Sequence, residues 1–102
     1  MLFHVTMTHT PEDCPGYNPE TIPEVVAALE KLEAVAKELN VKCYFWVEGA
    51  PEHVAYALIE ADNPGAVMGL VSAIPYRQDF KVTMVQHAQD IVAVAKTMME
   101  QR

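Results

Sequence analysis

A proline recurs at every fourth position from Pro11 to Pro23, within the stretch HTPEDCPGYNPETIP. Proline fixes φ and has no N–H donor, so neither an α-helix nor a central strand can run through this segment. We therefore expect a long, stiffened loop after the first apolar segment. Long loops in compact domains are commonly functional. This one also carries the reactive side chains of Glu12, Asp13, Cys14 and Tyr17, so it is the first candidate for a functional site.

The size and charge of the chain exclude several classes of protein. It has 102 residues, of which 51% are apolar, and this suits a single folded domain over residues 1–102. A net charge of -7 repels phosphate backbones, so we expect no nucleic-acid partner. No apolar run reaches the about 18 residues of a membrane span, so we expect no membrane partner. The N-terminus lacks the features of a signal peptide, which predicts a cytoplasmic protein with two free thiols.

Apolar periodicity divides the rest of the sequence into strands and helices. Thr21 followed by Glu24 matches a capping box at the start of a helix, and Asn40 is suited to a left-handed end of that helix. Asn63 and Pro64 mark the start of a second helix. The expected strands cover residues 2–9, 41–48, 53–61 and 80–87, and the expected helices cover residues 21–39, 64–74 and 88–101.

This element order, β-α-β-β-α-β with a terminal helix, predicts an α+β ferredoxin-like fold with a four-stranded antiparallel sheet. Right-handed crossovers place the first and third strands in the centre, with the fourth beside the first and the second beside the third. Two helices then cover one face. The other face would carry Tyr44, Trp46 and Tyr56. Because an exposed aromatic patch is typical of an interface, we expect a homodimer packed through this open face of the sheet.

In its pattern and element order, nearly the whole chain resembles the dimeric α+β barrel superfamily, in which two ferredoxin-like subunits close their sheets into one barrel. That group includes antibiotic-biosynthesis monooxygenases, muconolactone isomerases, stress-responsive barrel proteins and chlorite dismutase-like haem proteins. The resemblance implies a homodimeric barrel and a ligand cleft between sheet and helices, near the loops. It transfers no catalytic residue, because no family motif matches residue by residue, and a fold alone does not determine function.

One group of candidate site residues gathers around the proline loop. His9 ends the first strand, and antiparallel pairing should bring His53 close to it. Cys14 and Tyr17 belong to the adjoining loop, and Asn63 is expected at the same end of the sheet as a ligand-binding residue. These groups can exchange protons with a ligand, and imidazole with thiolate can bind zinc, nickel or copper. Purely structural roles for all of them remain an alternative.

A second group lies on the expected barrel face. Antiparallel pairing of the first and fourth strands should bring His4 near His87. This pair could share a metal or form interface hydrogen bonds. Tyr44, Trp46 and Tyr56 could hold a flat ligand inside the barrel or pack in an interface.

Three functions remain open on the sequence. The first is a cofactor-independent monooxygenase or isomerase acting on a small organic molecule near residues 9–21, with His9, His53 and Tyr17 as catalytic residues. The second is a transition-metal module that uses histidines. The third is a non-catalytic ligand-binding or assembly subunit.

Overall fold

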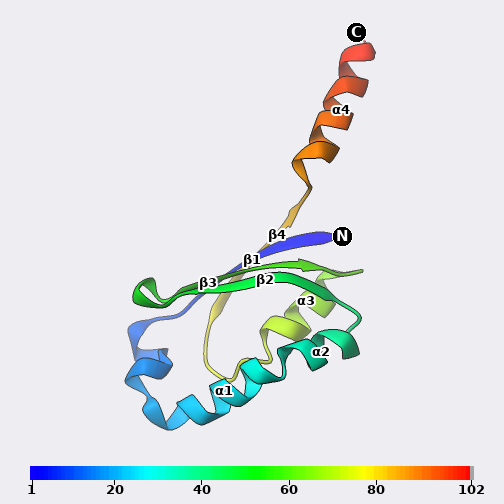
Figure 1. Ribbon diagram of the computed structural model, residues 1–102. Coiled ribbons are helices and arrows are strands. Elements are labelled where there is room, and N and C mark those ends of the chain that lie inside the picture. The colour runs from blue at the N-terminus through cyan, green and yellow to red at the C-terminus, as the bar shows by residue number, and fades with distance from the viewer. Residues whose placement is uncertain (102) are drawn as a thin grey trace.

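The computed structural model describes residues 1–101 and has an α+β architecture built on one four-stranded sheet (Figure 1). Neighbouring strands are antiparallel throughout and follow the order β2-β3-β1-β4. This is the order that right-handed crossovers predict, and it is consistent with a ferredoxin-like fold. The strands are β1 (Leu2–Thr8), β2 (Lys42–Gly49), β3 (Val54–Glu60) and β4 (Asp79–Val85).

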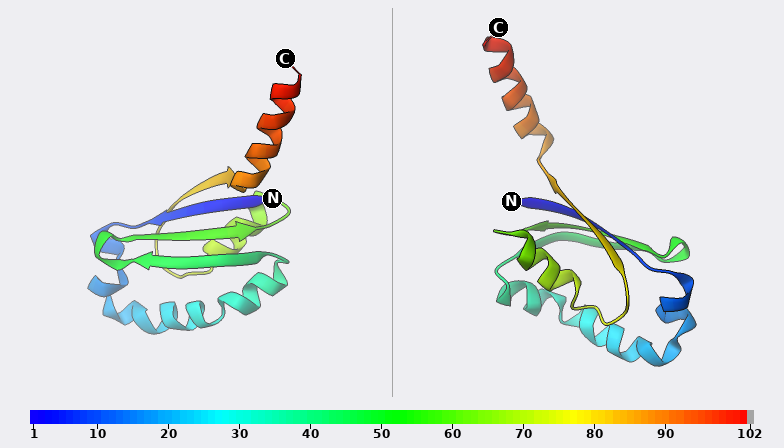
Figure 2. Two further views of the ribbon diagram at one scale, coloured as in Figure 1. Left: turned by 45° about the horizontal axis from the view of Figure 1, so that its top comes forward. Right: turned by 180° about the vertical axis from the view of Figure 1, so that it is seen from behind.

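Three helices lie on one side of the sheet and the last one rises on the other side (Figures 1 and 2). The covering helices are α1 (Ile22–Glu30), α2 (Leu32–Glu38) and α3 (Pro64–Val71), and the last helix is α4 (Ala88–Glu100). A turn at Lys31 divides the expected first helix into α1 and α2. Within residues 1–101, no helix is both long and apolar enough to cross a bilayer.

The proline loop is not structureless but consists of three successive 3-10 turns, Pro11–Asp13, Pro15–Tyr17 and Pro19–Thr21. Each turn begins with one of the prolines, at a position where a helical turn needs no N–H donor. Each repeat of four residues therefore consists of a three-residue 3-10 turn that begins with proline, followed by one connecting residue. The physical effect is a stiff segment between β1 and α1.

The predicted ends of the helices are correct at two positions and wrong at one. Asn40 adopts a left-handed φ of 56°, as expected at a helix end. The Asn63 Oδ1 atom accepts a hydrogen bond from the Ala66 backbone N at 2.9 Å and so caps α3. The capping box at Thr21 is wrong. Thr21 ends the third 3-10 turn in a helical conformation, whereas a capping residue needs an extended one, and its hydroxyl donates instead to the Asn18 carbonyl at 2.8 Å.

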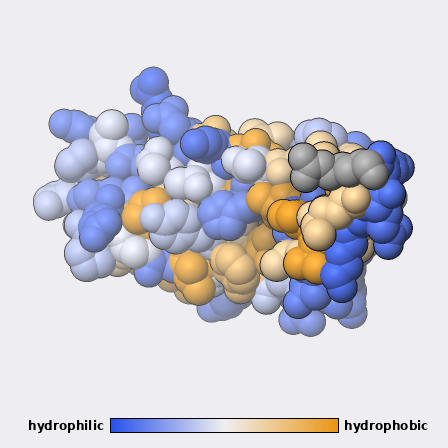
Figure 3. All heavy atoms as spheres, turned by 90° about the horizontal axis from the view of Figure 1, so that it is seen from above, coloured by the Kyte–Doolittle hydropathy of each residue, from blue (hydrophilic) through white to orange (hydrophobic). Residues whose placement is uncertain are grey.

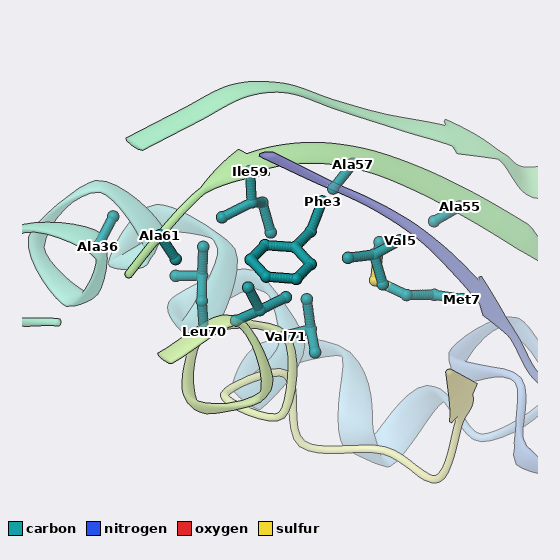
Figure 4. Packing of buried hydrophobic residues seen from close by; sticks show 11 residues of the cluster. Phe3, Val5, Met7, Ala36, Ala55, Ala57, Ile59, Ala61, Leu70 and Val71 are labelled. Carbon is teal, nitrogen blue, oxygen red and sulfur yellow. The ribbon is translucent and has the colours of Figure 1, made fainter. Parts of the chain in front are cut away.

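The core lies between the sheet and α3. Figure 4 shows the Phe3 ring among Ile59, Leu70 and Val71, and all four side chains are buried. Truncating a fully buried leucine such as Leu70 to alanine typically costs about 2–5 kcal/mol of stability. Helix α1 has no buried residue, and α2 contributes Ala36, so the core depends mainly on β1, β3 and α3.

A β-bulge in β2 changes which side chains face the helices. Cys43 pairs with Ile59 and the next paired residue, Phe45, faces Leu58, so Tyr44 is an extra residue in the ladder. One inserted residue reverses the alternation of side chains beyond it. Trp46 therefore packs against the core on the helix-covered side. The expected position of Trp46 on the open face is wrong for this reason.

Candidate functional site

His9 and His53 meet at one end of the sheet, where β1 ends and β3 begins. The last residue pair of the β1–β3 ladder is Thr8 with Val54, so the two histidines are the next pair along it. The His9 backbone N donates to the His53 carbonyl at 3.2 Å. In the side chains, His53 Nδ1 lies 3.2 Å from His9 Nε2, which is hydrogen-bonding distance. The predicted proximity of these two residues is confirmed.

The backbone of His53 is in a left-handed conformation, with φ 56° and ψ 43°. It follows the 3-10 turn Ala50–Glu52, and its N–H donates to the Ala50 carbonyl at 3.3 Å. Histidine is among the residues that tolerate this region better than most. Residues in sparsely populated conformations cost about 1–3 kcal/mol and cluster at functional sites, so this turn is consistent with a constrained position for the His53 ring.

The proline loop brings Cys14 to the two histidines. Ligand atoms of His9, Cys14 and His53 all lie within 4.8 Å of one another, and each side chain is half-buried. Asn18 holds this part of the loop, because its Nδ2 donates to the Glu12 carbonyl at 2.7 Å and to the Cys14 carbonyl at 2.9 Å. We missed this role of Asn18 in the sequence, although asparagine commonly bonds to the backbone of turns.

Tyr76 completes one wall of the site and was also missed. Its ring meets the His9 ring edge to face, with centroids 5.1 Å apart. Burial is the main cause that raises the pKa of Tyr76 to about 12, and its neighbours Glu48 and Cys14 act in the same direction. Tyr76 is therefore a neutral phenol at physiological pH. It comes from the loop before β4, far from His9 in the sequence, so no local pattern could have indicated it.

Tyr17 lies at the rim of the site, while Asn63 lies outside it. The Tyr17 ring centroid is 6.2 Å from that of His53, and 68% of the residue is exposed. Asn63 follows β3, whereas His53 precedes it. The two are therefore separated by the length of a seven-residue strand, roughly 23 Å. The expectation that Asn63 approaches the histidines is wrong, because it lies beyond the opposite end of β3.

The surroundings of His9 lower its pKa and so favour the neutral imidazole. Burial is the main cause that lowers the pKa of His9, and the neighbouring His53 lowers it further. Glu48 and Asp13 act in the opposite direction but do not reverse the shift. A neutral imidazole can accept a proton or bind a metal ion.

Two hollows bear on where a ligand could bind. A polar one of about 340 Å³ lies beside the site, with His9, Asp13 and Arg77 in its wall. A more apolar one of about 430 Å³ lies between α2 and β2, against Trp46. The first hollow touches the histidine cluster at His9 and lies in the region near residues 9–21 where the sequence predicts a pocket, whereas the second does not touch the cluster.

The second predicted group does not come together as a metal site. His4 pairs with Thr83 across β1 and β4, and His87 lies four residues farther along, beyond the end of β4. On the open face, the His4 ring instead contacts Tyr56 and Phe45, with centroids 5.9 and 6.4 Å away. Tyr44 also lies on this face, where its hydroxyl donates to Glu60 at 2.6 Å. These residues form an aromatic surface rather than a cluster of metal ligands.

Comparison with known proteins adds no family assignment, since no protein-family model and no curated protein sequence matches this chain. The site itself therefore carries the functional argument. It combines two imidazoles, one thiol and a neutral phenol at the end of a sheet, beside a polar hollow. Such a set can bind a transition metal or exchange protons with a small ligand.

Proposed function

We propose that the protein binds a transition-metal ion through His9, Cys14 and His53. The observation that carries this proposal is the convergence of one thiol and two imidazoles within 4.8 Å, from three separate segments of the chain. Nitrogen and thiolate donors are the usual ligands of zinc, and the same set also suits copper. Of the two histidine pairs that the sequence offers as metal ligands, the proposal uses His9 with His53 and not His4 with His87.

The distances are close to those that a metal ion requires. Two imidazole nitrogens about 2.0–2.1 Å from a tetrahedral zinc ion lie roughly 3.3–3.4 Å apart. The separation of 3.2 Å between His53 Nδ1 and His9 Nε2 is close to this value. A thiolate in the same shell would lie roughly 3.6 Å from each nitrogen. Because all three ligand atoms already lie within 4.8 Å, a side-chain rotation that moves sulfur by on the order of 1 Å would complete the geometry.

Three protein ligands leave a fourth coordination position open, as in catalytic zinc sites. The 340 Å³ hollow touches His9, so it gives a small organic ligand a route to this position. Tyr76 packs on His9 and Tyr17 lies near His53 at the rim. In this proposal, a small molecule in the predicted pocket would bind directly beside the metal ion.

Native mass spectrometry and elemental analysis of the purified protein, followed by zinc titration against a competing chelator, test the proposal. We expect one metal ion per chain. Cys14→Ser should weaken binding at least about 100-fold, because losing a direct ligand costs more than the 10–100-fold typical of outer-shell residues. The matched control is Cys43→Ser, since Cys43 is the other free cysteine and lies on β2. No uptake of zinc or copper, or equal losses in both variants, would contradict the proposal.

A second candidate function is metal-independent acid–base catalysis on a small organic molecule, which is the monooxygenase or isomerase hypothesis from the sequence. The neutral His9, hydrogen-bonded to His53, favours it, because such a pair can pass a proton between its nitrogens. The two candidates differ in their need for Cys14. A metal-free protein that retains an organic ligand in native mass spectrometry, and keeps it after Cys14→Ser, would favour the second.

We also propose that the protein works as a homodimer through the open face of the sheet. Tyr44, Phe45, Val47 and Tyr56 on that face each expose between 38% and 50% of their surface. Exposed apolar patches of this kind mark protein interfaces. Light scattering that gives the mass of one chain at micromolar concentration would contradict this part of the proposal.

A further inference from the structure

Helix α4 stands away from the rest of its own chain. It rises on the open side of the sheet, opposite α1–α3 (Figure 1), and every residue of the helix is exposed. Only Gln86 and His87 connect it to β4, and His87 is extended, with φ -67° and ψ 146°. The chain therefore makes no turn that would return α4 to its own sheet.

The surface of α4 requires a packing partner. At 100° per residue, six apolar residues fall on one side of the helix, namely Ala88, Ile91, Val92, Ala95, Met98 and Met99. The four largest expose 53% to 67% of their surface. A 13-residue helix is marginal in water without tertiary contacts. The stripe must therefore be covered if α4 is to be a stable element.

Charge favours a second copy of this chain as the partner. The protein carries a net charge of -7, yet the open face balances Lys42 and Lys81 against Glu60 and Asp79. In the part of the terminal segment that the structure describes, residues 88–101, Lys96 balances one of the two acids Asp90 and Glu100. Most of the acidic excess lies elsewhere in the chain, so these two surfaces can meet their own copies with little net repulsion.

The available apolar area points to the same partner. Seen from above, apolar side chains gather on the side of the molecule where α4 rises toward the viewer (Figure 3). Tyr44, Phe45, Val47 and Tyr56 on the open face are at most half exposed, so they cannot alone supply the about 800 Å² per partner that a stable interface buries, since even a whole aromatic side chain buries only about 150–250 Å². The α4 stripe adds four more large apolar side chains that are each more than half exposed, so both surfaces together come closer to that size than either does alone.

We infer that α4 crosses to a second copy of this chain and packs its apolar stripe on that partner, reciprocally in both subunits. This inference rests on the homodimer proposed above and not on the metal site. Facing sheets lie about 10 Å apart, and a 13-residue helix is about 20 Å long. Helix α4 is therefore long enough to extend past the partner sheet and pack against it.

The direct test is an isotope-filtered NOE experiment on the full chain. One half of the sample carries 13C-labelled methionine methyl groups, and the other half is unlabelled; the mixture is refolded together. We expect NOEs from the Met98 and Met99 methyl groups to protons of the unlabelled chain. A dimer in which these methyl groups show NOEs only within their own chain, or none, overturns the inference and leaves the homodimer standing. A monomer overturns both.

Matched variants on α4 give an independent readout by light scattering. Met98→Glu places a charge in the apolar stripe and should weaken dimerisation at least tenfold. Thr97→Glu, on the opposite side of the same helix, should change it less than twofold. Equal effects of the two variants would overturn the inference, and circular dichroism checks that both variants remain folded.

Discussion

In one of the two predicted histidine pairs the side chains meet, and in the other they do not, although the sequence places both pairs on neighbouring strands. The first pair, His9 and His53, occupies directly opposite positions at the end of the β1–β3 ladder, with side-chain nitrogens 3.2 Å apart. In the second pair, His4 lies opposite Thr83, so His87 falls four residues beyond it. Two side chains on neighbouring strands can share a ligand only if the strand register places them directly opposite one another; adjacency of the strands is not enough.

The surroundings of the two pairs differ as well. The proline loop adds Cys14 to the first pair, and Tyr76 packs on it. His4, by contrast, contacts the rings of Tyr56 and Phe45 on the open face. The same residue type thus serves a polar cluster at one end of the sheet and an aromatic surface in the middle of it.

The largest expected contrast between the pairs is in metal affinity. His9→Ala and His53→Asn should each weaken zinc binding at least about 100-fold, because each removes a direct ligand. Asparagine tolerates the left-handed conformation at position 53, so the turn should survive the substitution. A competition titration measures the affinity. His4→Ala and His87→Ala are the controls and should change it less than twofold; a comparable loss in either control would contradict the assignment of the site.

An intermediate contrast is expected between two asparagines. Asn18→Ala should weaken zinc binding about 10–100-fold, because Asn18 holds the backbone of Cys14 rather than the metal. Asn63→Ala should leave zinc binding unchanged and lower the free energy of unfolding by about 1 kcal/mol, the usual cost of a lost helix cap. Zinc titration and thermal melting separate these outcomes. If Asn63→Ala weakened zinc binding as much as Asn18→Ala, the loop would not be what positions Cys14.

The smallest contrast is in proton affinity. In the metal-free protein, NMR titration should give His9 a pKa below the ordinary histidine value of about 6.5, because burial and His53 disfavour its charge. The unfolded chain then binds this proton more readily than the folded one. Stability should therefore fall as the pH drops below about 6.5 toward the pKa of His9, and it should be unaffected by this group above that range. A His9 pKa above 6.5 would show that Glu48 and Asp13 outweigh burial.

Much of the fold could be predicted because its determinants are local. Alternating apolar residues specified the strands, and Asn40 and Asn63 indicated ends of helices that the structure confirms. The position of Trp46 could not be predicted in this way. A single extra residue at Tyr44 reverses the pleat, and nothing in a sequence of aromatic residues distinguishes a regular strand from a bulged one.

The candidate site was predictable in part for the same reason. His9 and His53 flank paired strand ends, so topology alone brought them together. Cys14 was indicated by its place in the loop that follows His9. Tyr76 could not be predicted, because its contact with His9 depends on the path of the loop before β4. The expectation for Asn63 was wrong because β3 runs away from His53 to the opposite end of the sheet, so a residue that follows its last position, Glu60, lies far from the histidines.

X-ray absorption spectroscopy of the zinc-loaded protein tests the central claim most directly, because it reports the atoms bound to the metal. We predict one sulfur at about 2.3 Å and two imidazole nitrogens at about 2.0–2.1 Å, with one further light ligand. The sulfur should disappear in Cys14→Ser and persist in Cys43→Ser. A shell of nitrogen and oxygen alone in the unsubstituted protein would contradict the account.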